Sequence, residues 1–224
     1  MPNRKRAAVC IISGGMDSAL GAKIAKKEGY EIIALHFNYG QRTEKKELDS
    51  FRKISKKLGC RESYEIDLDF FKEIGASALT DSSIDVPTGG VESGVPITYV
   101  PFRNGIFISI ATALAEKHGA EALFIGVVEE DSSGYPDCRD SYIKSMEKSI
   151  NLGTKDETKL QIKMPLVHMQ KSEIVIKSIE LGAPLEDTWS CYKNEEKACG
   201  VCDSCRLRLN GFEKAGVKDP IEYM

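Results

Sequence analysis

Short apolar runs alternate with longer segments of helical periodicity along most of this chain. The runs typical of strands are residues 7–12, 31–37, 62–67, 121–127 and 161–166. The segments typical of helices are residues 17–27, 43–58, 105–118, 139–150 and 171–182. Repeated strand–helix units form a parallel sheet with helices on both faces, because each crossover lays its helix on the sheet. The pattern therefore predicts an α/β fold, a doubly wound parallel sheet.

Four loops follow or approach the predicted strand ends, at residues 13–18, 38–43, 99–104 and 128–139. Ligands of parallel sheets bind at the carboxyl ends of the strands, so we expect the site to be built from these loops. A long segment rich in Gly, Ser, Asp and Pro covers residues 75–98. Such loops are usually functional or disordered.

The first of these loops is the sequence Ser13-Gly14-Gly15-Met16-Asp17-Ser18, between an apolar strand and a helix. Free backbone N–H groups, the positive end of the helix dipole and two hydroxyls are the components of a phosphate site. Glycines allow the backbone to approach an anion closely. Asp17 could cap the helix or help to hold Mg²⁺. The alternative is a glycine-rich turn that binds no ligand, with Asp17 acting only as the N-cap of the helix.

A cysteine cluster lies near the carboxyl end of the chain, in the segment "WSCYKNEEKACGVCDSCRLR". Two overlapping C-x-x-C steps and one more distant cysteine can converge on a tetrahedral metal ion, and four thiolates favour a structural Zn²⁺ site. A disulfide pair, a redox C-x-x-C motif and an iron–sulfur cluster are the alternatives. The predicted metal ligands are Cys191, Cys199, Cys202 and Cys205.

Other candidate site residues stand in the remaining loops. The acidic loop "GVVEEDSSGYPDCRD" contains Glu129, Asp131, Tyr135 and Asp137, which we interpret as ligand-binding residues. The alternative is a solvated acidic loop without a ligand. Arginine can clamp a carboxylate or phosphate through its planar guanidinium. We therefore expect three basic residues to contact substrate or phosphate: Arg42, Arg103 and Lys171.

The overall composition excludes some classes of protein. The chain has 224 residues and a net charge of −3, which disfavours a nucleic-acid-binding module because such proteins need a basic surface. No apolar run approaches the roughly 20 residues of a membrane span. Seven cysteines without an export signal suggest a reducing compartment, so we expect a cytoplasmic protein.

Taken together, these motifs resemble those of the 7-cyano-7-deazaguanine synthase (QueC) family, and the glycine loop resembles that of the N-type ATP pyrophosphatases. The similarity covers nearly the whole chain and rests on "SGGMDS", "FNYGQR", "VPFRN", "GVVEEDSSGYPDCRDSY", "TWSCY" and "CGVCDSCRLR". It implies an adenine nucleotide alpha hydrolase-like sheet over residues 1–186 and a zinc-binding and helical segment over 187–224. It also implies a homodimer.

The resemblance further implies a reaction: ATP·Mg²⁺ adenylates 7-carboxy-7-deazaguanine, ammonia displaces AMP, and a second activation dehydrates the amide to the nitrile. The product would serve 7-deazapurine modification of tRNA or DNA. The implied ATP contacts are Ile12, Ser13, Gly14, Gly15, Met16, Asp17, Ser18, Ala19, Leu20, Gly21 and Ala22. The candidate catalytic residues are Ser13, Asp17, Ser18, Arg103 and Asp137. The candidate substrate contacts are Arg42, Phe102, Arg103, Asn104, Glu129, Asp131, Tyr135, Pro136, Asp137 and Lys171.

Two positions depart from the family pattern, and two alternatives stay open. Thr43 stands where the family usually has His, and Phe102 stands where it usually has a small residue, typically Gly. Relatives that stop at the amide or transfer the deazaguanine acyl group share the loop and the cysteine cluster. A tRNA sulfurtransferase with the same ATP loop would need Cys138 or Cys60 as its persulfide carrier.

Overall fold

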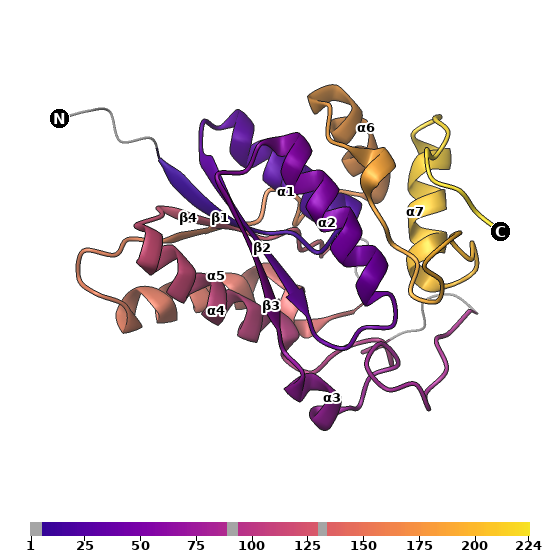
Figure 1. The fold of residues 1–224 in the computed structure, drawn as a ribbon, viewed down its shortest axis with the longest axis horizontal. Coiled ribbons are helices and arrows are strands. Elements are labelled where there is room, and N and C mark those ends of the chain that lie inside the picture. The colour runs from indigo at the N-terminus through magenta and orange to yellow at the C-terminus, as the bar shows by residue number, and fades with distance from the viewer. Residues whose placement is uncertain (1–5, 89–93, 130–133) are drawn as a thin grey trace.

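A five-stranded parallel sheet forms the centre of the protein in the computed structural model, which describes residues 6–88, 94–129 and 134–224 (Figure 1). The strand order is β3-β2-β1-β4-β5. The strands are β1 (Ala7–Ile11), β2 (Glu31–Asn38), β3 (Glu62–Asp67), β4 (Ala122–Phe124) and β5 (Gln161–Lys163). Every neighbouring pair is parallel. The predicted doubly wound α/β fold is confirmed.

Alternate residues of the central strand β1 pack against opposite layers of helices, because successive side chains of a strand point to opposite faces. Ala8 and Cys10 share a core with α1 (Met16–Lys27) and α2 (Glu44–Leu58). Val9 and Ile11 share the other core with α4 (Arg103–His118) and α5 (Asp140–Gly153). Figure 1 shows the two helix pairs on opposite sides of the sheet.

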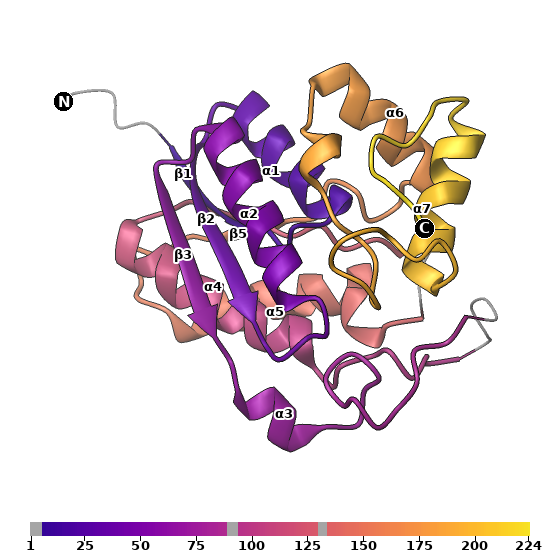
Figure 2. The same cartoon turned by 45° about the vertical axis from the view of Figure 1, so that its right-hand side comes forward.

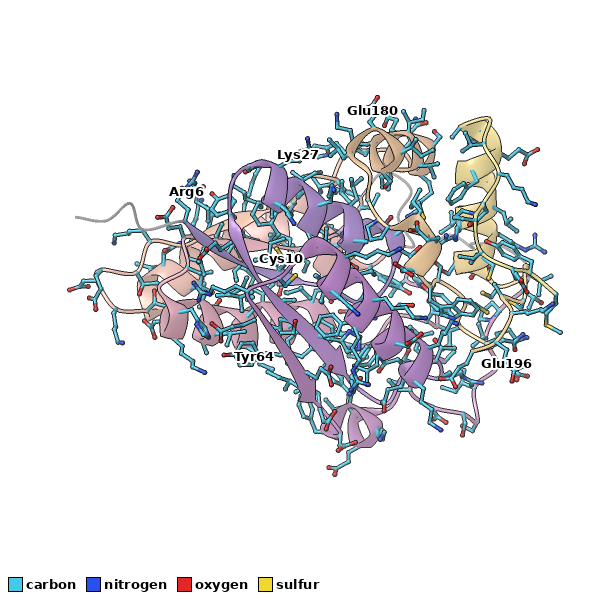
Figure 3. The ribbon with its side chains drawn as sticks, turned by 45° about the horizontal axis from the view of Figure 1, so that its top comes forward. Arg6, Cys10, Lys27, Tyr64, Glu180 and Glu196 are labelled. Carbon is cyan, nitrogen blue, oxygen red and sulfur yellow. The ribbon has the colours of Figure 1, made fainter. Side chains whose placement is uncertain are left out.

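Burial on both faces explains why β1 and β2 are apolar runs and not alternating sequences. Cys10 is 1% exposed, and burial raises the pKa of its thiol well above the usual range. Figure 3 shows Cys10 in the interior, whereas Lys27, Glu180 and Glu196 lie at the periphery.

The predicted elements agree with the structure apart from some boundaries. The strands predicted over 121–127 and 161–166 are shorter, and β5 ends at Lys163, two residues before Pro165, which has no N–H for a strand ladder. Helix α4 begins two residues earlier than predicted. Three short helical segments were not predicted: α3 (Phe70–Ile74) and the 3₁₀ turns Pro136–Cys138 and Leu185–Asp187.

Two further helices, α6 (Lys171–Leu181) and α7 (Asp203–Lys214), lie beside α1 on the side of the molecule away from β3 (Figures 1 and 2). Met16 and Leu20 of α1 share an apolar core with Ile174 of α6 and Phe212 of α7. No helix in the described ranges is long and apolar enough to cross a bilayer.

A buried ion pair holds the segment after α7 against that helix. The Arg208 guanidinium donates to both oxygens of Asp219 at 2.7 and 2.9 Å, and their side chains are 1% and 5% exposed. Arg208 also donates to Thr188 Oγ1 at 2.7 Å. These bonds join α7 to the segments on either side of it in the sequence.

The switch point of the sheet lies between β1 and β4, because the chain crosses from one face to the other there. Helix α1 follows β1, and Gly126 follows β4. A Cβ at Gly126 would lie 2.8 Å from the Ser18 backbone nitrogen. The absence of a side chain at Gly126 therefore lets the chain after β4 lie directly against the first turn of α1, at the crevice where ligands of such sheets bind.

We predict opposite effects of alanine at two glycines. Gly126→Ala should lower the free energy of unfolding by about 1–3 kcal/mol, because its Cβ would overlap backbone atoms of Asp17 and Ser18. Gly21→Ala is the matched control, since its Cβ would meet nothing within 4 Å and alanine favours a helix, and should raise stability by about 0.5–1 kcal/mol. Urea denaturation measures both. Equal stability of the two variants would contradict the packing described.

Candidate active site

The loop Ser13–Ser18 forms a compact hydroxyl-lined turn at the start of α1. The Ser18 hydroxyl lies 2.9 Å from Gly15 O and 3.2 Å from Ser13 Oγ. The backbone N–H groups of Ser13 and Gly15 donate to Ser18 Oγ and Ser13 Oγ, at 3.1 and 3.3 Å. Two hydroxyls and the amino end of a twelve-residue helix thus converge on one point, the arrangement expected of a phosphate site.

Gly14 is required by the packing of this loop. Its φ is +94°, and a Cβ there would lie 2.6 Å from the backbone oxygen of Glu47 on α2. Its carbonyl accepts the Trp189 N–H at 2.9 Å. The loop is therefore held between α2 and the segment that precedes the cysteine cluster.

Asp17 and Lys171 form an ion pair across the front of the loop. Lys171 Nζ lies 3.0 and 2.8 Å from the two Asp17 carboxylate oxygens, with side chains 15% and 27% exposed. Lys171 is the first residue of α6, where Gln170 and Glu173 form a capping box. The structure thus brings together two charged residues that the sequence analysis selected separately.

A cavity of about 270 Å³ opens in front of the loop. Its walls come from the carboxyl ends of β1, β2 and β4, from the helices α1, α2, α4 and α6, and from the segment 189–208. The predicted site residues that line it are Ile12, Ser13, Gly15, Met16, Asp17, Ser18, Arg103, Asn104, Tyr135 and Lys171. The parallel sheet therefore gathers candidates that are up to 159 positions apart (Ile12 to Lys171).

Arg103 and Tyr39 form a cationic and aromatic wall. The Arg103 guanidinium donates to Tyr39 Oη at 3.0 Å and lies 5.3 and 5.8 Å from the rings of Tyr39 and Phe107. Burial acts to lower the pKa of Arg103, but nearby Tyr39, Tyr135 and Asp137 outweigh it and raise the pKa. The Arg103 Nε is buried without a hydrogen-bond partner. A planar anionic or polar group could accept a bond there.

Asn104, Asp137 and Cys138 form the support behind this wall. Asp137, which is 3% exposed, accepts the Asn104 backbone N–H at 2.9 Å and so satisfies the amino end of α4. The Asn104 side chain donates to Cys138 Sγ at 3.3 Å. Burial, followed by the Asp137 charge, raises the pKa of Cys138 to about 12.

Several predicted substrate contacts lie away from the described lining. Arg42 donates to the carbonyl oxygens of Ala78, Asp81 and Ile84 at 2.7, 3.0 and 2.5 Å, and thereby holds the long loop after α3. The Glu129 carboxylate accepts the Asp140 N–H at 3.3 Å, and Pro136 begins a 3₁₀ turn. Asp131 lies outside the described residues. The substrate roles of these residues stay predictions.

Phe102 is exposed and strained. Its φ and ψ are 54° and 24°, a left-handed conformation that residues other than Gly seldom adopt. Its ring packs edge-on against Tyr142, with centroids 5.9 Å apart. Glycine adopts this backbone conformation without strain, whereas Phe102 adopts it at a cost in backbone strain.

Glu47, which no sequence motif indicated, also lines the cavity. It accepts the Thr43 hydroxyl at 2.8 Å and the Gln41 side-chain amide at 3.2 Å. Burial raises the pKa of Glu47 to about 7, although these hydrogen bonds and the charge of Arg103 act in the opposite direction. One signal was available, because Glu47 lies four residues after Thr43 and so on the same face of the helix.

The four predicted cysteines converge as expected. The sulfur atoms of Cys191, Cys199, Cys202 and Cys205 all lie within 4.8 Å of one another. Backbone N–H groups of Lys193, Asn194 and Cys199 point to Cys191 Sγ at 3.4 Å, and the Cys202 N–H points to Cys199 Sγ at 3.4 Å. Such donors stabilise thiolates. Four sulfurs on two tight turns fit a tetrahedral metal ion.

The cysteine cluster also supports the cavity. Trp189, Ser190 and Tyr192, which flank Cys191, are lining residues. The Thr43 hydroxyl, just before α2, lies between the Glu47 carboxylate at 2.8 Å and the Cys191 carbonyl oxygen at 3.1 Å, and its one proton is shared between them. Loss of the cluster would therefore disturb one wall of the cavity.

The chain is similar in sequence to known proteins over nearly its whole length. The family model described as "Queuosine biosynthesis protein QueC" matches residues 7–216. The 7-cyano-7-deazaguanine synthase of Sulfurovum sp. (strain NBC37-1) is 79% identical over 96% of this chain and 97% of that protein. The synthase of Sulfurimonas denitrificans is 69% identical over 99% of both. A predicted tRNA methyltransferase subunit from Methanocaldococcus jannaschii, 19% identical over 97% of this chain and 92% of that chain, shares the fold with a TM-score of 0.51.

We predict that the purified protein contains a metal ion bound by the cysteine cluster. Cys202→Ser should lose most of this metal and unfold at lower denaturant concentration, because a structural metal stabilises only the folded state. Cys10→Ser, at a buried cysteine outside the cluster, is the control and should retain the metal. Elemental analysis measures the metal content of both variants, and urea denaturation measures the stability of Cys202→Ser. A folded wild-type protein without metal would contradict the assignment.

Proposed function

Because this chain belongs to the QueC family of queuosine biosynthesis proteins, we propose that it converts 7-carboxy-7-deazaguanine, ammonia and ATP into 7-cyano-7-deazaguanine. The observation that carries the proposal is the shared cavity. The Ser13–Ser18 loop, suited to phosphates, opens into the same space as the arginine and tyrosines that suit a planar anionic base. An enzyme that joins a nucleotide to a carboxylate needs the phosphate-binding loop and the substrate-binding wall in one cavity, because the two reactants must meet.

The chemistry begins with a carboxylate that must be activated. One carboxylate oxygen attacks the α-phosphorus of ATP, pyrophosphate leaves, and an acyl adenylate forms. Ammonia then attacks the carbonyl carbon, the bond to AMP breaks, and the nitrogen loses a proton to give the amide. In a second round the amide oxygen attacks another ATP, and loss of AMP and the two remaining N–H protons gives the nitrile.

The Ser13–Ser18 loop would hold the phosphates of ATP. The amino end of α1 and the Ser13 and Ser18 hydroxyls stabilise the charge that builds on the departing pyrophosphate. Lys171 would contact a phosphate, and Asp17 would be released to hold Mg²⁺, which neutralises phosphate charge when bound. Until ATP binds, the ion pair between Lys171 and Asp17 holds both side chains beside the loop.

The opposite wall would bind the deazaguanine. Arg103 would pair with the carboxylate, and Tyr135 and Trp189, two of the aromatic lining residues, would stack on the base. Tyr135 is fixed by its hydroxyl, which donates to Thr98 Oγ1 at 2.9 Å. Phe102, the third stacking candidate, is half exposed outside the described lining.

We further propose Zn²⁺ as the metal of the cysteine cluster, in a closed site with a structural role. All seven cysteines are free of disulfides, which fits a reducing, cytoplasmic location. A homodimer is proposed from the family resemblance.

The sulfurtransferase alternative is not favoured. A persulfide carrier must form a thiolate near neutral pH. Burial raises the pKa of Cys138 to about 12 and that of Cys60 to about 11, so both thiols stay protonated. The names of the relatives at 79% and 69% identity also speak for nitrile formation over an enzyme that stops at the amide.

We predict that incubation with 7-carboxy-7-deazaguanine, ATP, Mg²⁺ and ammonium gives the nitrile, with AMP formed in parallel. Mass spectrometry of the product checks this directly. Accumulation of the amide alone would show that the enzyme stops after one activation. Product formation only with an added sulfur donor would contradict the proposal.

A further inference from the structure

We propose that Glu47 is the catalytic residue that accepts the proton lost by the nitrogen nucleophile, an inference that rests on the ligase function proposed above. When ammonia attacks the acyl adenylate, its lone pair forms the carbon–nitrogen bond and the bond from carbon to AMP breaks. The nitrogen then carries one proton too many for an amide. The Glu47 carboxylate takes that proton, becomes a carboxylic acid, and returns the proton to solvent.

Glu47 adjoins both halves of the cavity. Its backbone oxygen lies against Gly14 of the phosphate loop, where an added Cβ would approach within 2.6 Å. Glu47 lines the cavity together with Ser13 and Arg103, and its carboxyl lies close enough to Arg103 for that charge to act on its pKa. The activated carbon must lie between the α-phosphate and the wall that binds the substrate, so a carboxyl at this junction is within reach of the attacking nitrogen.

Two hydrogen bonds hold the Glu47 carboxyl in one orientation. The Thr43 hydroxyl donates to Oε1 at 2.8 Å and the Gln41 amide donates to Oε2 at 3.2 Å. Thr43 and Gln41 are themselves 1% and 5% exposed. Each carboxylate oxygen therefore accepts one hydrogen bond, with the Thr43 proton shared with the Cys191 carbonyl oxygen at 3.1 Å, and keeps a second lone pair that can accept a proton.

Other lining groups are less suited to this step. Among the described lining residues the carboxylates are Asp17 and Glu47, and Asp17 is paired with Lys171. Burial raises the pKa of Tyr39 and of Cys138 to about 12, so neither is a base at neutral pH.

The surroundings adjust Glu47 to its task. Burial raises its pKa to about 7, against the hydrogen bonds and the charge of Arg103, while Glu44 adds to the rise. A proton acceptor works best when its pKa lies near the working pH, because it can then both take and release the proton.

Glu47→Gln tests the proposal by separating two steps. Pyrophosphate exchange into ATP, dependent on 7-carboxy-7-deazaguanine, should stay within about threefold of wild type because adenylation needs no base. Amide formation from ammonia should fall by about 100-fold or more. Hydroxylamine, a less basic nucleophile whose adduct loses its proton readily, should trap the adenylate in the variant within about tenfold of the wild-type rate.

Glu44→Gln is the matched control. Glu44 is on the same helix and its carboxylate accepts the Gly40 N–H at 3.2 Å, but it does not belong to the described lining. All three rates should stay within about threefold of wild type, because Glu44 is the smallest of the influences that act on the pKa of Glu47. If Glu47→Gln does not fold, Glu47→Asp replaces it, because the carboxyl is kept but withdrawn by one methylene, and amide formation alone should fall by about tenfold.

Two results would overturn the inference. Amide formation by Glu47→Gln at the wild-type rate would show that another group takes the proton. Equal losses of exchange and amide formation in both Glu47 variants would show that the residue only holds the loop in place. A wild-type enzyme without carboxylate-dependent exchange would instead refute the proposed function.

Discussion

The site depends on how closely three chain segments approach the first turn of α1. Gly14 lets the α2 backbone lie against the loop, and Gly126 lets the end of β4 lie against Ser18. The Trp189 N–H completes the enclosure through its bond to Gly14 O. Because backbone atoms meet at these points, the amino end of the helix is held in position, and an anion there would draw the Ser13 and Ser18 hydroxyls from their bonds within the loop.

The segment after α6 shapes the cavity as well as carrying the cysteines. Trp189, Ser190 and Tyr192 face the cavity, while Cys191 belongs to the cluster. The buried Arg208–Asp219 pair holds the chain after α7 to the same segment through Thr188. Metal binding would thus stabilise a wall of the active site while remaining apart from the chemistry, as expected of a closed four-sulfur site.

Much of this could be predicted from the sequence because local patterns carry it. Apolar runs and helical periodicity located the strands and main helices, and spacing located the cysteine cluster. Glu47 and Tyr39 were missed because their roles depend on which elements the sheet brings together. Arg42 shows the reverse case, since an arginine beside a strand end can equally bind carbonyl oxygens of its own chain. The φ of Phe102 likewise cannot be read from residue type.

In the proposed reaction the cavity joins a carboxylate to the α-phosphorus of ATP. Substrate carrying a heavy oxygen isotope in both carboxylate positions tests this most directly, because adenylation transfers a carboxylate oxygen to AMP in each round. We expect labelled AMP from both rounds and unlabelled pyrophosphate. Label in orthophosphate, or AMP without label, would contradict it.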